Sequence, residues 1–329
     1  MTASAIYGCS EATRARPLDR RDIPPEIRHA IRELQRRQPL RNWPIVVFFA
    51  LMTAGGWLVL QPRGWAARAV GSVAIAAGMV GLSVLMHEGC HNLLFSSRRL
   101  SRLVGFLCGT PVLISVSAYR ALHLLHHAYE HTERDPDDIE TVSRKGIPLV
   151  LLYYVLLVAG TFLYLPHVAI EGLKAAHGRE RAGITLEYAA ILSGMAAAWA
   201  LLPAGVMVRI WLIPLAIAAQ VTNLRSLAEH GLTTSGSPFT ASRSVQSNAL
   251  VRFVFCNLNY HLEHHLFPRV PWYNLPRVHE LLQPEYRRAG ASIYGSYAAF
   301  LVDFFRTSWA GLVPDVRLLP SHLRDDFCA

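Results

Sequence analysis

The stretch Asn257-Leu-Asn-Tyr-His-Leu-Glu-His-His-Leu-Phe-Pro268 places three histidines within five residues: His261, His264 and His265. On a helix, residues three and four positions apart lie on one face, so these rings can point at a common centre. Two earlier stretches show related spacings, His87-Glu-Gly-Cys-His91 and His123-Leu-Leu-His-His127. We call the three stretches histidine boxes; together they hold eight of the chain's 15 histidines. Because neutral imidazole is the commonest side-chain metal ligand, the sequence predicts one metal centre built from all three boxes.

Length and composition favour a single membrane domain. The chain has 329 residues, 52% of them hydrophobic, with a mean hydropathy of +0.26. The apolar residues are gathered in long runs that a soluble core does not need, and a helix requires about 20 such residues to cross a bilayer. We expect an all-α integral membrane protein with about four transmembrane helices in two hairpins. A cytoplasmic helical cap would carry the histidine boxes.

The first expected hairpin comes directly before the first box. Residues 44–60 and 66–86 are apolar runs of 17 and 21 residues, and a polar turn at 61–64 separates them. The second run leads straight into His87, so the first box is expected where a helix leaves the membrane. Residues 103–118 are apolar but short and interrupted, which favours a re-entrant or interfacial segment.

The later runs, 147–166, 187–203 and 205–222, leave two arrangements open. All boxes must reach one site, so the chain crosses the bilayer an even number of times between the second box and His230. We expect the last two runs to form the second hairpin, with 147–166 in the interface and a cytoplasmic loop at 168–186. In the alternative arrangement, 147–166 crosses and pairs with one long later helix.

The net charge of +9 is concentrated at the N-terminus, where residues 1–43 carry nine arginines against five acids. An arginine-rich segment ahead of an apolar span is typical of a cytoplasmic flank that touches lipid head groups, so no nucleic acid is expected as a partner. We expect three parts: this segment, a membrane domain at 44–308 and a C-terminal tail at 309–329. The expected location is a bacterial inner membrane, with the catalytic face in the cytoplasm.

The number of imidazoles indicates more than one metal. Eight box histidines, with His230 as a ninth, exceed the four ligands that one zinc ion takes. Sets of imidazole nitrogens suit iron, copper or zinc, and iron with open positions carries dioxygen chemistry. At a bilayer surface such a centre would meet a lipid-soluble substrate. The residues therefore favour a di-iron oxidase that attacks C–H bonds of a long chain.

Over residues 45–285 the boxes and their separations resemble the integral-membrane fatty acid desaturase and hydroxylase superfamily. The resemblance implies a cytoplasm-facing enzyme with two iron ions that uses O2 and two electrons from a separate ferredoxin or cytochrome b5-type donor. Carried over residue by residue, it implies nine metal ligands: His87, His91, His123, His126, His127, His230, His261, His264 and His265. Some members have an asparagine one turn before the extra histidine, where it holds a water on one iron. Ser226 stands at that position here, and Asn223 or Asn257 is the candidate substitute.

Several carboxylates near the boxes are candidates for orienting ligand rings by accepting their second N–H. For each of them, a solvated charge or a helix cap is the competing interpretation. They are Asp135, Asp137, Asp138, Glu88 and Glu263.

Rival interpretations come from the same residues. The first box also reads His-Glu-x-x-His, the pattern of zinc metalloproteases in which the glutamate is the base. That alternative leaves the other two boxes unexplained, and a metal transporter would need polar residues within the spans. Within the oxidase interpretation, we expect a fatty acyl desaturase. Hydroxylation or ketolation of an acyl or carotenoid-like lipid is the alternative, because both reactions begin by removing a hydrogen atom.

Overall fold

The computed structural model describes residues 18–62, 64–130, 132, 134–137, 146–231, 233 and 237–310. Regular structure in this part is helical apart from two strands of two residues each, so the predicted helical class is confirmed. The candidate residue Asp138 lies outside the described residues, as do residues 1–17 of the N-terminal segment and most of the predicted tail.

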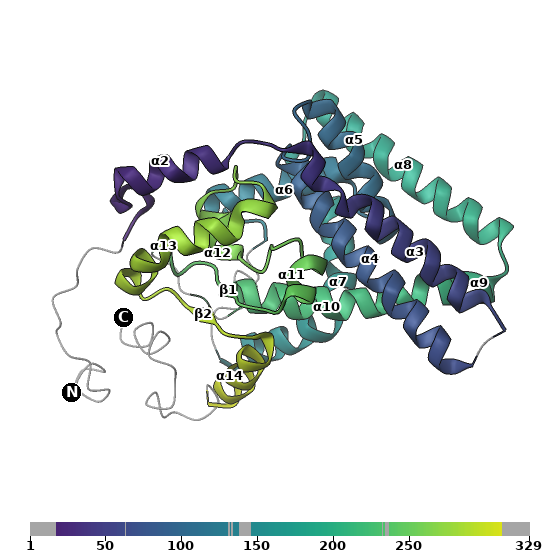
Figure 1. Cartoon of the computed structure of the whole chain (residues 1–329). Coiled ribbons are helices and arrows are strands. Elements are labelled where there is room, and N and C mark those ends of the chain that lie inside the picture. The colour runs from purple at the N-terminus through teal and green to yellow at the C-terminus, as the bar shows by residue number, and fades with distance from the viewer. Residues whose placement is uncertain are drawn as a thin grey trace.

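The first hairpin consists of α3 (Pro44–Leu60) and α4 (Trp65–Cys90), which run side by side in Figure 1. Pro44 opens α3, where its missing N–H is no loss. The two backbones touch at a glycine pair, since a Cβ on Gly55 would lie 2.6 Å from the carbonyl oxygen of Gly71. The helix α4, and α3 together with the turn that leads into it (Pro39–Leu60), are long and apolar enough to cross a membrane, as the two apolar runs predicted.

A bent pair of helices follows, formed by α5 (Arg98–Gly109), the 3-10 turn η3 (Thr110–Val112) and α6 (Val116–Tyr129). Ser97 and Ser115 cap α5 and α6, each accepting a backbone N–H of the first turn. The axes of the two helices differ by 99°, so they have the length of a membrane span only as a broken pair. The bend directs the second box, which lies on α6, back towards the end of α4.

A glycine inside the first box lets α5 approach α4. A Cβ on Gly89 would lie 2.7 Å from Gly105 Cα and 3.0 Å from the Ser101 carbonyl oxygen, and neither backbone atom can yield. We expect Gly89→Ala to lower the free energy of unfolding by about 1–3 kcal/mol, as overpacking of a close-packed contact does. Thermal unfolding of the detergent-solubilised protein measures it. Gly56→Ala, where nothing lies within 4 Å, should be no less stable than the parent; equal stability of the two variants contradicts the prediction.

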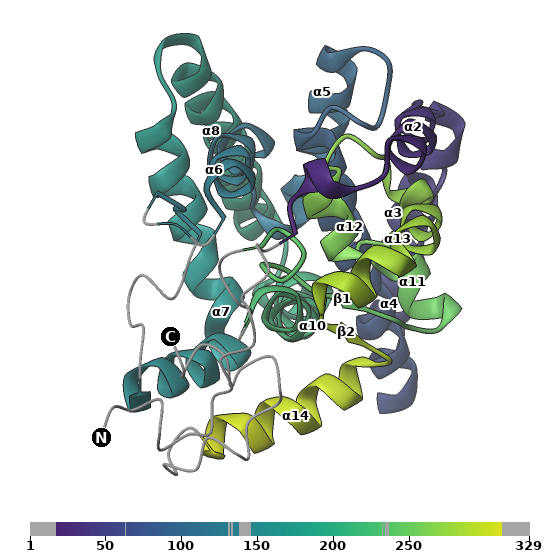
Figure 2. The same ribbon diagram turned by 90° about the vertical axis from the view of Figure 1, so that its left-hand side faces the viewer.

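Three long helical segments connect the second box to His230. They are α7 (Gly146–Ala175), α8 (Gly178–Leu201) and a continuous run of α9 (Ala204–Met207), the π-helical turn η5 (Val208–Leu212) and α10 (Ile213–His230). Figure 2 looks nearly along α10, which packs between α7 and α4. The described helices include five of span length, or six if the bent pair counts as one.

The loop expected at 168–186 is wrong, because helix covers all of it except Ala176 and His177. Gly178, at a φ of +52°, turns the chain between α7 and α8. Glu187 then fixes α8 to the start of α6, because its carboxylate accepts hydrogen bonds from Ser115 Oγ (2.6 Å) and the Ser117 N–H (3.0 Å). The sequence predicted a loop here because the charged residues in the first turn of α8 are exposed to solvent, as loop residues are.

The remaining elements lie next to the ends of α4 and α10 (Figure 1). From the N-terminal side come η1 (Arg20–Asp22), α2 (Pro25–Leu34) and η2 (Pro39–Asn42). From the C-terminal side come β1 (Ser244–Val245), α11 (Ala249–Val254), α12 (His261–Leu266), η6 (Trp272–Asn274), α13 (Leu275–Ala289), β2 (Ile293–Tyr294) and α14 (Tyr297–Ala310). The strands pair in parallel, and α2 packs on α13.

Buried polar contacts fasten these elements to the long helices and to one another. The Trp272 N–H donates to Glu88 in the first box (3.0 Å), and the Trp272 indole donates to Asn42 (3.0 Å). Arg243, 1% exposed, donates to the carbonyl oxygens of Ala228 and Gly231 at the end of α10 (2.8 and 3.0 Å). These contacts hold the third box against the ends of α4 and α10.

Candidate metal centre

The three boxes meet at one place, where the ends of α4 and α10 face α6 and α12. The first of two groups of imidazoles contains five residues, each offering one nitrogen within 4.8 Å of the others. This five-histidine group consists of His87, His91, His123, His127 and His264. Its members come from all three boxes, so segments up to 177 residues apart (264 − 87) supply one cluster.

Spacings within the five-histidine group fit a bound metal ion. The Nε2 atom of His123 lies 2.9 Å from that of His87 and 3.0 Å from that of His127, which lies 3.0 Å from that of His264. Ligands at right angles around a metal with bonds of about 2.1 Å stand about 3 Å apart. The Nε2 atom of His91 is buried without a hydrogen-bond partner. The donors therefore converge as a ligand set does.

The second, four-histidine group is built around the end of α10. Nε2 of His261 lies 2.7 Å from Nε2 of His230 and 3.0 Å from that of His265. The ring of His126 has its centroid 4.9 Å from the His230 ring and 5.0 Å from the His265 ring. All nine predicted histidines thus lie in two neighbouring groups, which approach to 4.4 Å between the ring centroids of His127 and His265.

Carboxylates stand behind the rings of the four-histidine group. The His126 Nδ1–H donates to Asp135 at 3.0 Å, an orientation that matches the role expected for Asp135. Glu229 Oε2 lies 3.4 Å from Nδ1 of His261, and Glu130 Oε1 lies 3.0 Å from Nδ1 of His265. Sequence reasoning missed Glu130 and Glu229. Glu130 follows the box histidine His127 by three residues, and Glu229 directly precedes His230. This closeness to a predicted ligand is the signal that would have found them.

The other carboxylate and amide candidates have different partners. Glu263, completely buried, accepts from His279 Nδ1 (2.5 Å) and from the Tyr286 hydroxyl (2.6 Å), so it holds α12 on α13. Asn223 Oδ1 accepts from the Thr161 N–H (2.6 Å) and hydroxyl (2.7 Å), which ties α10 to α7. Asn257 lies in the turn before α12 at a φ of 52°.

Burial keeps three of the converging histidines, His91, His261 and His264, neutral. Burial, with the nearby Arg120 adding to it, lowers the pKa of His91 to about 3. Burial and neighbouring histidines also hold the pKa values of His261 and His264 well below the usual range. A metal binds the unprotonated ring, so at neutral pH these imidazoles are already in the ligating form.

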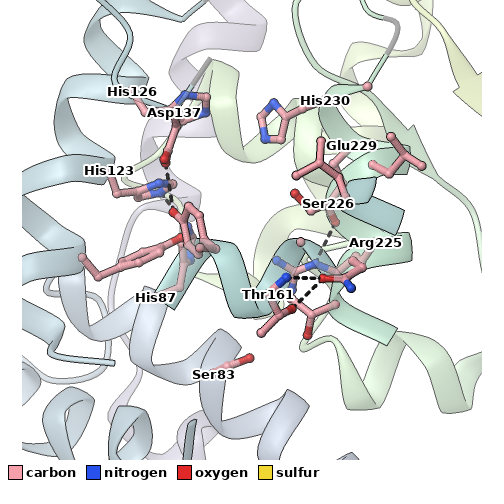
Figure 3. Close-up of a pocket in the computed structure, with 18 of the residues that line it drawn as sticks. Ser83, His87, His123, His126, Asp137, Thr161, Arg225, Ser226, Glu229 and His230 are labelled. Carbon is pink, nitrogen blue, oxygen red and sulfur yellow. Dashed lines mark hydrogen bonds and ion pairs between the residues drawn. The ribbon is translucent and has the colours of Figure 1, made fainter. Parts of the chain in front are cut away.

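A cavity of about 250 Å³ opens beside the two histidine groups, between α4, α6, α7 and α10. Figure 3 shows His87 and His123 on one side of it and Ser226 and Arg225 on the other. The rings of His126, His230 and His261 also line it. The rest of the lining is largely apolar and includes Met86, Ile114, Leu156, Leu165 and Leu227. The cavity thus joins both histidine groups to a space suited to an apolar chain.

A comparison with protein families identifies the chain. The model of the fatty acid desaturase family matches residues 63–297, which include every histidine of the five-histidine and four-histidine groups. This chain belongs to the fatty acid desaturase family. It is accordingly an O2-dependent oxidoreductase of lipid metabolism, and the predicted family is confirmed.

Individual relatives of this desaturase family member are distant. The chain is 27% identical to the human sphingolipid delta(4)-desaturase/C4-monooxygenase over 275 residues, 78% of each protein. It is 25% identical to a fatty acid desaturase of Bacillus subtilis, over 64% of this chain and 67% of the relative. It is also 25% identical to the dihydrorhizobitoxine desaturase of Bradyrhizobium elkanii, over 68% and 70%. Such identities support a desaturase-type enzyme and leave the substrate open.

The zinc-protease alternative does not fit this desaturase. Its general base would be Glu88, which has to reach a metal-bound water. Glu88 is completely buried, its Oε2 accepts the backbone N–H of Trp272, and it is not among the residues that line the cavity. The glutamate of the first box therefore fastens α4 to η6.

Proposed function

We propose that this chain is a membrane di-iron desaturase that inserts a double bond into a fatty acyl chain, using O2 and two electrons. The observation that carries the proposal is the pairing of a five-histidine and a four-histidine group beside one largely apolar cavity. Imidazole sets of this kind suit iron, and bound iron supplies dioxygen activation and one-electron chemistry. Two ions, one in each group, account for all nine histidines.

The chain's own residues prepare the site. The nine rings would hold the metals, and the cavity would present one segment of the acyl chain to the side where His87, His123 and His126 lie. Removal of a hydrogen atom from an unactivated carbon requires that carbon to be held within a short distance of the oxidant. The rigid walls of α7 and α10, fixed together by Asn223 and Thr161, provide that constraint.

Hydroxylation is the second candidate outcome. The human relative is named for both a desaturase and a monooxygenase activity, so one active site of this kind accommodates both. Both outcomes begin with loss of one hydrogen, and placement of the substrate decides whether a second hydrogen leaves or oxygen is inserted. We propose desaturation as the main reaction, with hydroxylated product as a minor one.

The catalytic face is proposed to be cytoplasmic, where a separate ferredoxin or cytochrome b5-type donor would dock. A hollow between α5, α6 and α8 is lined by Arg102, Arg120, Arg179 and Glu180, and an acidic donor would complement it. We expect the Arg102→Gln/Arg179→Gln variant to slow turnover with an acidic ferredoxin, most strongly at low salt. The same rate and salt dependence as the parent would exclude this surface.

Lipid analysis of a host that expresses the chain tests the proposed function. Comparison with the host alone should show a new unsaturated acyl species, two mass units lighter than its precursor. Addition of 18O2 should label water and not the main product, since desaturation does not insert oxygen. If every new product carries 18O, hydroxylation is the reaction; if no lipid changes and the purified protein holds no iron, the proposal fails.

A further inference from the structure

The first residue after α6, Glu130, lies between two histidines of the four-histidine group. Its Oε1 atom is 3.0 Å from Nδ1 of His265 on α12 and 3.8 Å from Nδ1 of His230 at the end of α10. The Glu130 side chain is only 10% exposed. A carboxylate is costly to bury unless it is paired, so these two rings are its natural partners.

The two nitrogens of an imidazole lie on different edges of the ring, and this decides what Glu130 does. The Nε2 atoms of His265 and His230 face Nε2 of His261, at 3.0 and 2.7 Å. Glu130 meets the same two rings at their Nδ1 edges. Glu130 is also absent from the described residues that line the cavity, whereas His230 and His261 are among them. The carboxylate therefore stands on the outer side of the nitrogens that converge.

A different assignment would make Glu130 itself a ligand, since one of its oxygens lies within 4.8 Å of a nitrogen from each of His126, His230 and His265. That assignment would leave out His261, although its Nε2 makes the shortest contact in the group, 2.7 Å to His230. A set of four Nε2 atoms uses all four histidines, and each ring then keeps its Nδ1 edge for a carboxylate. The geometry favours the four-imidazole set.

Glu130 differs from the other carboxylates because it lies beside histidines of two helices, His265 on α12 and His230 on α10. Asp135 contacts the ring of His126. Glu229 is shared between His261 and Arg225, with its Oε1 3.2 Å from Arg225 Nε. Among the described ion pairs, the five-histidine group has one such contact, between His87 and the neighbouring Glu88 at 3.7 Å. The outer negative charge is thus concentrated behind the four-histidine group.

We propose that Glu130 is a positioning residue for one metal only. Its carboxylate lies beside the Nδ1 edges of His265 and His230. The negative charge there favours the proton on Nδ1 of both rings, which leaves Nε2 free and directed inward, and so makes the metal of the four-histidine group bind more tightly. The proposal rests on the proposed di-iron function. Partners that orient ligand rings typically contribute about 10- to 100-fold to metal affinity.

Release of iron to a chelator tests this role without turnover. Purified full-length protein loaded with Fe(II) should release its two ions in two phases. We expect Glu130→Gln to accelerate one phase about 10- to 100-fold and to leave the other unchanged. His264→Ala makes the five-histidine group incomplete, so it should leave only the release phase of the four-histidine group. When Glu130→Gln is added to His264→Ala, that remaining phase should be the accelerated one. Glu280→Gln serves as the matched control, because Glu280 pairs with Arg277 on the exposed face of α13.

The outcomes separate this inference from the proposed function. Parent protein that never holds about two irons would overturn the di-iron function. If the parent holds two but Glu130→Gln releases both at parental rates, the positioning role is wrong. One fewer oxygen ligand per two irons by X-ray absorption in Glu130→Gln than in the parent would make Glu130 a ligand, which also overturns it. Thermal unfolding of the metal-free variant at the parental temperature excludes a folding defect.

Discussion

Replacing His264 by alanine is expected to abolish turnover and to reduce bound iron from about two ions per chain to about one. His264 Nε2 lies 3.0 Å from that of His127, and its ring lies 4.4 Å from the His87 ring, so it links the second and first boxes within the five-histidine group. Loss of a ligand should cost more than the about 10- to 100-fold that loss of a ring-orienting partner costs. Iron analysis of purified protein and lipid analysis of the expressing host measure the two effects.

The control for this experiment is His177→Ala. His177 is exposed, precedes α8 and lies outside both histidine groups. This variant should therefore keep both irons and its activity. The yield of His264→Ala in the membrane fraction should match that of the control, because the buried core of α4 and α6 is unchanged. Full activity of His264→Ala would remove the third box from the active site.

Placing phenylalanine at position 226 is expected to reduce turnover at least tenfold while both irons remain bound. Ser226 lines the cavity one turn before His230, and its side chain is exposed rather than packed. A phenylalanine ring at this position would occupy space that the substrate needs beside the histidine groups (Figure 3). The loss of a productive substrate position by about 1 Å costs on the order of 10²-fold in rate. Conversion in membranes and iron per chain are measured together.

Ser226→Ala is the matched control and should keep most of the activity, since it leaves the cavity open. Two results would count against the cavity as the substrate site. One is parental turnover in Ser226→Phe, and the other is loss of iron that accounts for the whole loss of activity.

The two variants separate the metal centre from the substrate cavity. His264→Ala changes iron and turnover together, whereas Ser226→Phe changes turnover alone. The same separate electron donor is used in both measurements, so it does not affect the comparison.

The sequence predicted for a physical reason which histidines would come together. Residues i, i+3 and i+4 share a helix face whatever the tertiary fold, so the spacing of His123, His126 and His127 already implies a common direction. The spacing does not say which rings share a metal. In the structure His123 and His127 belong to the five-histidine group and His126 to the other, because adjacent positions on a helix point about 100° apart.

The orienting groups were harder to foresee. Asp135 was expected and does contact a ring, whereas Glu263, from within the third box, contacts His279 and Tyr286 instead. A carboxylate between two ligands on a helix points away from them, since position i+2 lies on the opposite face. Glu130 reaches its two rings only because the bend before α6 brings the end of that helix to α10 and α12.

The sequence alone determined the helical class, the family and the nine imidazoles, because apolar run length and local spacing are properties of the chain itself. Only the tertiary structure decided how these rings divide into five and four, which carboxylates stand behind them, and where the cavity opens. Those features depend on contacts between α4, α6, α10 and α12, whose residues are separated by up to 177 positions (264 − 87). Contacts of that range are set by packing and by buried hydrogen bonds between elements, which no local pattern records.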